Sequence, residues 1–246
     1  DTVDFKEGDQ SLVFDGSTKI QYNDGTFLNA STSSRSVSVW IKPTTLSGIQ
    51  EILDEGGNGN GLAIRLNNAT LEAQITNNTD PDESVSATFP NDGDWHHIAM
   101  VFDGANTSLK LYIDGVLENT NASAFSLLDT HTSPGGIGGV WNNDAFNSVE
   151  TGTYFTGKMD AFSVYDSVLS DTQIEEASCL EPEPPVSGCE AVAGYEAYWN
   201  FDVANGADDA SGNGHDVYAT VGSITYDGSD LIQGDQSVIF NGSSSI

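Results

Sequence analysis

Apolar and polar residues alternate with a period of two along much of the chain. The segment SVSVWIKP places valine, valine and isoleucine at every second position, and turn sequences such as Asp114-Gly115 separate the alternating segments. Since successive side chains of a strand point to opposite sides, this alternation is typical of strands with one buried face. The pattern is clearest in four segments, 36–43, 61–66, 71–75 and 109–113. It predicts an all-β chain, an antiparallel β-sandwich of the jelly-roll type.

One short helix is expected at 170–178. Ser170 is a favourable helix N-cap, and Asp171 places a negative charge in the first turn, where the helix dipole stabilises it. This helix would close the first structural unit.

Residues 1–20 recur at 227–246, with ten of the twenty aligned positions identical and a constant offset of 226. An offset of this size corresponds to a whole β-rich domain plus a linker, and so suggests tandem repeats. We expect a jelly roll without its opening strand over 1–178, a Pro/Glu-rich linker over 179–194, and the opening strands of the next repeat over 195–246. Residues 198–202 would then fill the open position, either by folding back or by entering another molecule.

Charge and cysteine content limit the partners and the compartment. With 37 acidic and 7 basic residues, the formal net charge is −30, which disfavours nucleic acid and anionic membrane surfaces. No apolar run approaches the about 18 residues of a membrane span. Cys179 and Cys189 flank the linker and no histidine lies nearby to complete a zinc site, so a local disulfide in an oxidising, extracytoplasmic setting is expected.

A series of segments follows the order of a known family. The chain resembles the bacterial laminin-G-like (LamG) jelly rolls of the concanavalin A-like lectin/glucanase superfamily. The segments that carry the resemblance are AYWNFD, DASGNGHD, GDQSLVFDGSTKI and its copy GDQSVIFNGSSSI, SVSVWIKP, EILDEGG, DWHHIAMVFDG, LKLYIDGVL, IGG and FTGKMDAFSVYDSVLSDTQIEE.

The resemblance implies a structural Ca²⁺, which takes six to eight oxygen ligands. The matching positions are Asp160, Asp15, Gly16 and Asp202. Asp160 lies between apolar residues of a half-buried strand, where an unpaired carboxylate would be costly. The alternative is that these are ordinary turn aspartates.

The same resemblance implies carbohydrate binding. Trp40, Trp95 and Trp199 fall within strand motifs and are expected in the core, whereas Trp141 lies in a long polar stretch. An exposed tryptophan beside amides and carboxylates is a candidate sugar platform. The candidate ligand-binding residues are Trp141, Asn142, Asn143, Asp144 and Tyr154. The alternative is that Trp141 is a lid over the edge of the sandwich.

Catalysis is not expected. Glycosidases of this superfamily need paired carboxylates on one strand face, at alternate positions. Glu51 and Asp54 are three residues apart, which predicts opposite faces, and the adjacent His96 and His97 offer no triad.

The sequence therefore predicts a non-enzymatic, secreted or surface-located LamG-like repeat that acts in adhesion or carbohydrate recognition and holds calcium. The alternative is a structural spacer or filament unit, linked to neighbouring copies by strand exchange and without a sugar ligand. A glycoside hydrolase accessory module has less support.

Overall fold

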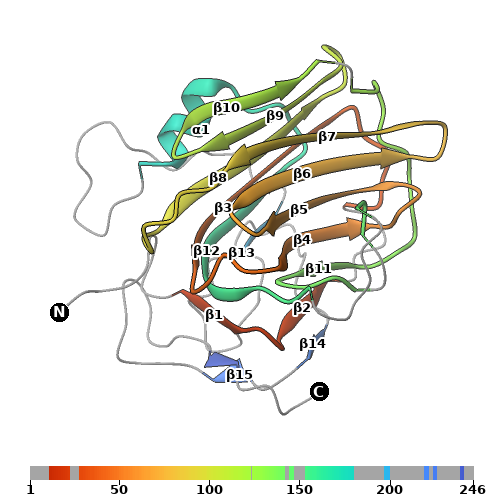
Figure 1. The fold of residues 1–246 in the computed structure, drawn as a ribbon. Helices are drawn as coiled ribbons and strands as arrows, with labels where there is room; N and C mark the ends of the chain where they lie inside the picture. The colour runs from red at the N-terminus through yellow and green to blue at the C-terminus, as the bar shows by residue number, and fades with distance from the viewer. Residues whose placement is uncertain are drawn as a thin grey trace.

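Two largely antiparallel sheets, called A and B, are stacked face to face in the computed structural model of the chain (Figure 1). The structure describes residues 11–22, 28–122, 124–141, 144–146 and 153–179, together with four short strands of the C-terminal part. The predicted antiparallel β-sandwich with one short helix is confirmed.

The spatial order of the strands differs from their order along the chain. Sheet A contains, from edge to edge, β10 (Val116–Asn121), β9 (Ser108–Ile113), β8 (His96–Asp103), β3 (Ser34–Pro43), β12 (Thr156–Tyr165), β1 (Leu12–Asp15), β16 (Ile239–Phe240) and β15 (Ile224–Thr225), with β13 (Ala197–Trp199) also paired to β12. Sheet B contains β14 (Ala219–Val221), β2 (Lys19–Tyr22), β11 (Gly135–Ile137), β4 (Ile49–Gly56), β5 (Gly61–Asn67), β6 (Thr70–Asn77) and β7 (Asp80–Thr88).

The hydrophobic core lies between the sheets and follows the alternation of the sequence. Val37, Val39 and Ile41 of β3 are fully buried and face the core, as the period of two predicts. The corresponding apolar positions of sheet B are also fully buried, namely Leu62, Ile64, Leu66, Leu71, Ala73 and Ile75. The other side chains of these strands therefore point to the outer faces, which is where charged groups can lie.

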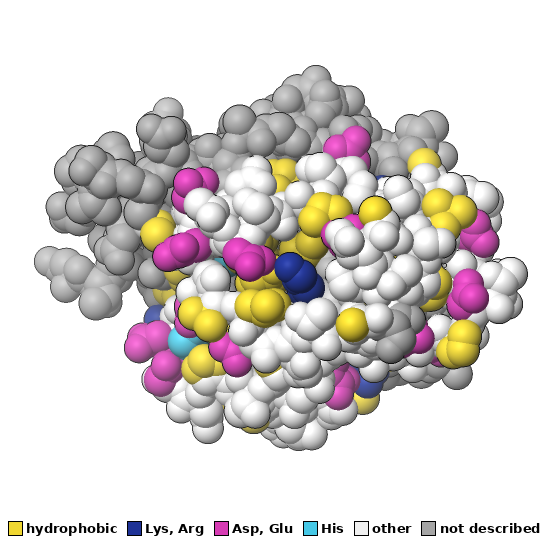
Figure 2. Space-filling view, turned by 90° about the horizontal axis from the view of Figure 1, so that it is seen from above, with side chains coloured by type: hydrophobic (Ala, Val, Ile, Leu, Met, Phe, Trp, Pro, Cys, Tyr) yellow, Lys and Arg dark blue, Asp and Glu magenta, His cyan; other side chains and the backbone are white. Residues whose placement is uncertain are grey.

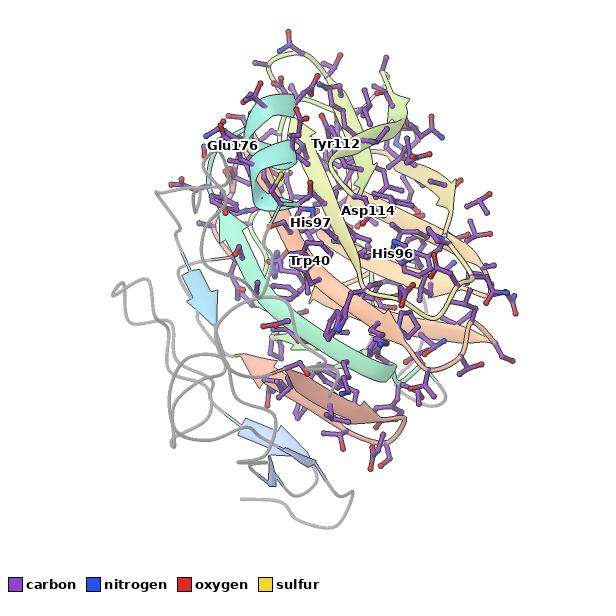
Figure 3. The ribbon with its side chains drawn as sticks, turned by 90° about the vertical axis from the view of Figure 1, so that its left-hand side faces the viewer. Trp40, His96, His97, Tyr112, Asp114 and Glu176 are labelled. Atoms are coloured by element: carbon purple, nitrogen blue, oxygen red, sulfur yellow. The ribbon has the colours of Figure 1, made fainter. Side chains whose placement is uncertain are left out.

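Helix α1 (Asp171–Ala177) begins where the sequence predicts. The Ser170 side chain accepts a hydrogen bond from the backbone of Gln173, and the Gln173 side chain caps the Ser170 backbone in return. Ile174 packs in a small apolar cluster with Tyr112 on the outer face of sheet A. Figure 3 shows α1 lying beside Tyr112.

Strand β12 has a different neighbour along each half of its length. β1 pairs with residues up to Met159, whereas β13 pairs antiparallel with Phe162–Val164. An irregularity between Asp160 and Ser163 separates the two halves. The backbone of residues 197–199 thus lies beside the closing strand within the same chain, in the position expected for the missing opening strand.

Two residues of the near-copy of the N-terminal segment, those of β16, lie in the same sheet between β1 and β15. Ile239 of β16 pairs with Val13 of β1 in parallel orientation. Most of residues 195–246 fall outside the described part of the chain. The boundaries at 178 and 194 and the tandem organisation therefore stay predictions.

The surface reflects the acidic composition. Figure 2 shows Asp and Glu side chains spread over the described part of the face seen from above, with only a few Lys or Arg among them. In the described residues no helix is both long enough and apolar enough to cross a bilayer.

Candidate functional site

A bulge in β4 brings two acidic side chains to the outer face of sheet B, the face turned away from sheet A. The pairing of β4 with β5 shifts between Glu51 and Leu53, so that Glu51 lies opposite Arg65 and Asp54 opposite Ala63. Directly opposed residues share a face, and positions 63 and 65 of β5 point the same way. The expectation that Glu51 and Asp54 face opposite sides is therefore wrong, because the bulge adds one residue between them.

The described parts of the segment between β11 and β12, residues 138–141, 144–146 and 153–155, lie over this face and are together called the covering loop. Its backbone is tied to sheet B at several points. The Trp141 N–H donates to the Asp54 carboxylate over 2.7 Å, and the Glu51 N–H donates to the Thr153 carbonyl over 2.7 Å. The Gln74 side-chain amide donates to the Ala145 carbonyl. These bonds fix the parts of the loop on either side of its centre.

Two cations of sheet B each lie against aromatic rings of the covering loop. Lys19 Nζ is 4.3 Å from the centre of the Trp141 ring and 5.8 Å from that of Tyr154, and it donates to the Val140 carbonyl over 2.7 Å. The Arg65 guanidinium carbon is 3.7 Å from the centre of the Phe146 ring. Such cation–aromatic contacts hold the rings in place.

These three rings are accessible to a ligand. Trp141, Phe146 and Tyr154 are each partly exposed, whereas Lys19 beneath Trp141 and Tyr154 is 1% exposed. Arg65 Nε forms an ion pair with a Glu72 carboxylate oxygen over 2.7 Å. Both cations are thus engaged inside the protein, while the aromatic surface remains available.

Carboxyl groups are buried beside these rings. Glu51 and Asp144 are 0% exposed and Asp54 is 1% exposed. Burial raises the pKa of Glu51 well above its usual value, and the nearby carboxyls of Asp144 and Asp54 raise it further. Burial also raises the pKa of Asp54, although the hydrogen bond from the Trp141 N–H acts in the opposite direction. The arrangement favours the neutral forms of Glu51 and Asp54, and all three carboxyl groups are buried away from the protein surface.

The structure gathers part of the predicted ligand-binding set. Trp141, Asp144 and Tyr154 lie together on the outer face of sheet B, and Asn142 and Asn143 fall outside the described residues. Sequence reasoning missed Phe146, Lys19 and Arg65. The available signal was that Lys19 and Arg65 occupy outward positions of strands in a chain with 7 basic residues.

The predicted calcium ligands are not all brought together. Asp15 lies opposite Thr156, and Asp160 is four residues further along β12, which places them about 13 Å apart at strand spacing. Asp15 and its neighbour Gly16 therefore do not share a coordination sphere with Asp160, and Asp202 lies outside the described residues. Asp160 is 0% exposed, and its carboxylate accepts from the Ala161 N–H over 2.8 Å.

Asp15 is instead part of a local turn. Its carboxylate accepts from the Ser17 N–H over 2.9 Å, from the Ser17 hydroxyl over 2.8 Å and from the Thr18 hydroxyl over 3.0 Å. Slight burial acts to raise the pKa of Asp15, but these hydrogen bonds lower it overall. Among the described side chains, no three Asp, Glu, His or Cys residues are placed to hold one metal ion. A calcium site centred on Asp160 stays a prediction.

The adjacent histidines point to opposite sides of β8, as predicted. His97 is 1% exposed on the outer face of sheet A, with its ring centre 5.4 Å from that of Trp40, and burial lowers its pKa to about 4 (Figure 3). His96 instead bonds two carboxylates, Asp114 over 2.7 Å and Asp92 over 3.0 Å. Neither arrangement is a catalytic triad.

The remaining tryptophans and cysteines have mixed outcomes. Trp40 is 5% exposed and thus buried as expected, against His97 on the outer face of sheet A, whereas Trp95 is partly exposed. The side chain of Trp199 and residue Cys189 fall outside the described part of the chain. The disulfide between Cys179 and Cys189 therefore stays a prediction.

Comparison of the sequence with known protein families gives a match over much of the chain. The family model Laminin_G_3, described as the concanavalin A-like lectin/glucanases superfamily, matches residues 14–175. A curated relative is the Sushi, von Willebrand factor type A, EGF and pentraxin domain-containing protein 1 of Rattus norvegicus, 31% identical over 99 residues. That match covers 38% of this chain and 3% of the relative's length.

Solved structures share the fold at low sequence identity. The CBM40 domain of the Ruminococcus gnavus IT-sialidase, bound to α2,3-sialyllactose, aligns with a TM-score of 0.55 and 17% identity, over 69% of this chain and 96% of that domain. A candidate carbohydrate-binding protein from Bacteroides ovatus aligns with a TM-score of 0.62 and 16% identity, over 88% of this chain and 59% of that one. The family match extends over more than half of the sequence, and the chain therefore belongs to the concanavalin A-like lectin/glucanases superfamily.

Proposed function

We propose that the chain is a non-enzymatic carbohydrate-binding module whose sugar site is the outer face of sheet B beneath and beside the covering loop. The observation that carries this proposal is the trio of partly exposed rings, Trp141, Phe146 and Tyr154, on a loop tied to the sheet. Sugar rings stack on such aromatic surfaces, and a preformed platform loses little entropy on binding.

Polar groups of the same face supply hydrogen bonds to sugar hydroxyls. Arg65 is only partly buried and lies against Phe146, and its ion-pair partner Glu72 is also partly buried. A few convergent polar groups beside an apolar surface are characteristic of sugar and small-molecule sites. The CBM40 and Bacteroides ovatus neighbours support the ligand class, since one is bound to a sugar and the other is described as carbohydrate-binding. At their low sequence identity, what they share with this chain is the fold.

The charge of this face selects against anionic sugars. Lys19 donates to the Val140 carbonyl and Arg65 is paired with Glu72. The carboxylate of a sialic acid would therefore meet two cations that already have partners, and beside Arg65 it would meet the like charge of the Glu72 carboxylate. We therefore assign neutral glycans to the site, in contrast to the sialyllactose bound by the CBM40 neighbour.

The cellular role that fits this site is adhesion by a secreted or surface protein, with a calcium ion at Asp160 stabilising the sandwich. The family supports this setting, because LamG-like folds are typical of extracellular proteins. A second role, as a unit that exchanges strands with neighbouring copies, is favoured by one observation. The short strands β13 and β16 pair along β12 and β1 by backbone contacts that another copy could equally supply.

A glycan array tests the proposal directly. The full chain should bind neutral glycans, and Trp141→Ala should lose about five- to tenfold in affinity for the strongest of them, because one aromatic stack contributes about 1–1.5 kcal/mol. Trp40→Phe on the opposite sheet is the matched control and should bind as the wild type does. Absence of binding to any neutral glycan, or equal binding by Trp141→Ala, would contradict the proposal.

A further inference from the structure

Glu51 has no hydrogen-bond donor among the described residues. Its side chain is 0% exposed, and neither carboxylate oxygen accepts a bond from any N–H or O–H group in that part of the chain. The polar group that contacts it is a second carboxyl, that of Asp144 in the covering loop. Two carboxylates cannot bond to each other, since both only accept hydrogen bonds. The contact therefore requires something positive between them.

A proton satisfies this contact with the groups at hand. Two buried negative charges in contact repel each other strongly, and two carboxyl groups in contact commonly hold one proton between them. A metal ion would need further ligands, and within the described residues no third Asp, Glu, His or Cys is placed to join them. A shared proton turns one carboxyl into a donor and removes the need for any ion.

We propose that Glu51 and Asp144 are positioning residues joined by a hydrogen bond from the protonated Glu51 carboxyl to Asp144, and that this proton holds the covering loop on sheet B at acidic and neutral pH. Asp144 lies between Trp141 and Phe146 in the sequence, so loss of the proton loosens the segment that presents both rings. The consequence for sugar affinity rests on the proposed function. The consequence for the loop itself does not.

The surrounding charges set the direction of the effect. Glu51 is faced by Asp144 from the loop, by Asp54 from its own strand and by Arg65 from β5. Arg65 favours the ionised form of Glu51 but is held by Glu72 from β6. Lys19 of β2 acts on Asp54.

Other elements around the pair add little charge. The paired residues of β11 are two glycines and an isoleucine, and the loop segment beside Glu51 contributes Tyr154, which pairs with it. Burial and the two aspartates dominate, so Glu51 keeps its proton well above the pH at which a free carboxyl loses it.

Hydrogen exchange of the full chain tests the loop directly. Between about pH 5 and about pH 9, the wild-type loop should lose protection, corrected for intrinsic exchange, by up to about tenfold per pH unit, the limit for one linked proton. Glu51→Gln carries a neutral amide that donates to Asp144 at every pH, so its loop should stay protected. Asp144→Asn removes the charge from the other partner and should behave in the same way. Glu118→Gln, an exposed change on β10, is the matched control and should follow the wild type.

Three results would overturn the inference. The first is a wild-type loop whose protection does not change with pH. The second is a loop in Glu51→Gln and Asp144→Asn that opens with pH as the wild type does. The third is restoration of the wild-type loop by calcium chloride at alkaline pH with no effect on either variant, because a metal ion would then occupy the pair.

A second arm separates this inference from the proposed function. The neutral glycan bound most strongly on the array is titrated at the same pH values. Its affinity should fall with loop protection in the wild type and stay constant in Glu51→Gln. A loop that opens as expected in a chain that binds no glycan would support the shared proton and overturn the proposed function. Glycan affinity that stays constant while the loop opens would overturn the link between them.

Discussion

Lys19 is the cation on which the covering loop depends most. The change Lys19→Met keeps the length and apolar character of the side chain and removes its ammonium group. The Val140 carbonyl then loses a charged hydrogen bond of 2.7 Å, which contributes about 1.5–3 kcal/mol in a buried setting. The contact with the Trp141 ring at 4.3 Å contributes about 0.5–2 kcal/mol more.

One effect acts in the opposite direction. A methionine avoids the cost of burying a charge, which offsets part of this loss. The carbonyl left without a donor decides the outcome, because an unsatisfied buried acceptor costs about 1–3 kcal/mol. We expect Lys19→Met to lower the free energy of unfolding by about 2 kcal/mol net.

Urea unfolding measures this change as a lower midpoint at an unchanged slope. Lys110→Met is the control, since Lys110 is a partly exposed lysine paired with Asp171 over 3.4 Å. Such exposed pairs contribute about 0–1 kcal/mol, so the control should lie close to the wild type. Equal midpoints for Lys19→Met and Lys110→Met would refute the anchoring role of Lys19.

Three further outcomes follow from individual contacts. The hydrogen bond to Asp114 raises the pKa of His96 against the opposing effect of burial. The stabilisation of the fold by this bond is therefore complete below the usual pKa of about 6.5 and is lost as pH rises through the raised pKa. The melting temperature of the wild type should fall across this pH range, and that of His96→Gln should not. Gly138→Ala should destabilise the fold by about 2 kcal/mol or more, because φ is +77° and the new methyl group would overlap the Phe14 ring. Gly48→Ala, at φ +80° in open space, should cost about 1 kcal/mol. Chemical denaturation of the two variants separates steric overlap from backbone strain. Calcium in large excess should stabilise the wild type by about 2–3 kcal/mol and leave the stability of Asp160→Ala unchanged. Identical wild-type melting temperatures with calcium and with chelator would contradict a stabilising calcium ion.

The strands could be predicted from the sequence because their signal is local. Alternation in 36–43 and 61–66 reports which side chains face the core, and the structure buries those positions. The helix was equally accessible, since Ser170 and Gln173 form its cap within four residues of chain.

The site could be predicted only in part because it depends on register and on a bulge. Glu51 and Asp54 share a face through one extra residue, which alternation cannot reveal. Asp15 and Asp160 lie apart because β1 pairs with β12 in a register that places Asp15 opposite Thr156, four residues along the strand from Asp160. The position of Phe146 over Arg65 joins segments 81 residues apart in sequence, and only the fold brings them together.

The most direct test of the central claim is a crystal structure of the chain with the neutral glycan that binds most strongly on the array. The account predicts a sugar ring stacked on Trp141, with Tyr154 or Phe146 beside it, on the outer face of sheet B. A sugar bound to the outer face of sheet A or to the edge of the sandwich, with the covering loop untouched, would contradict it.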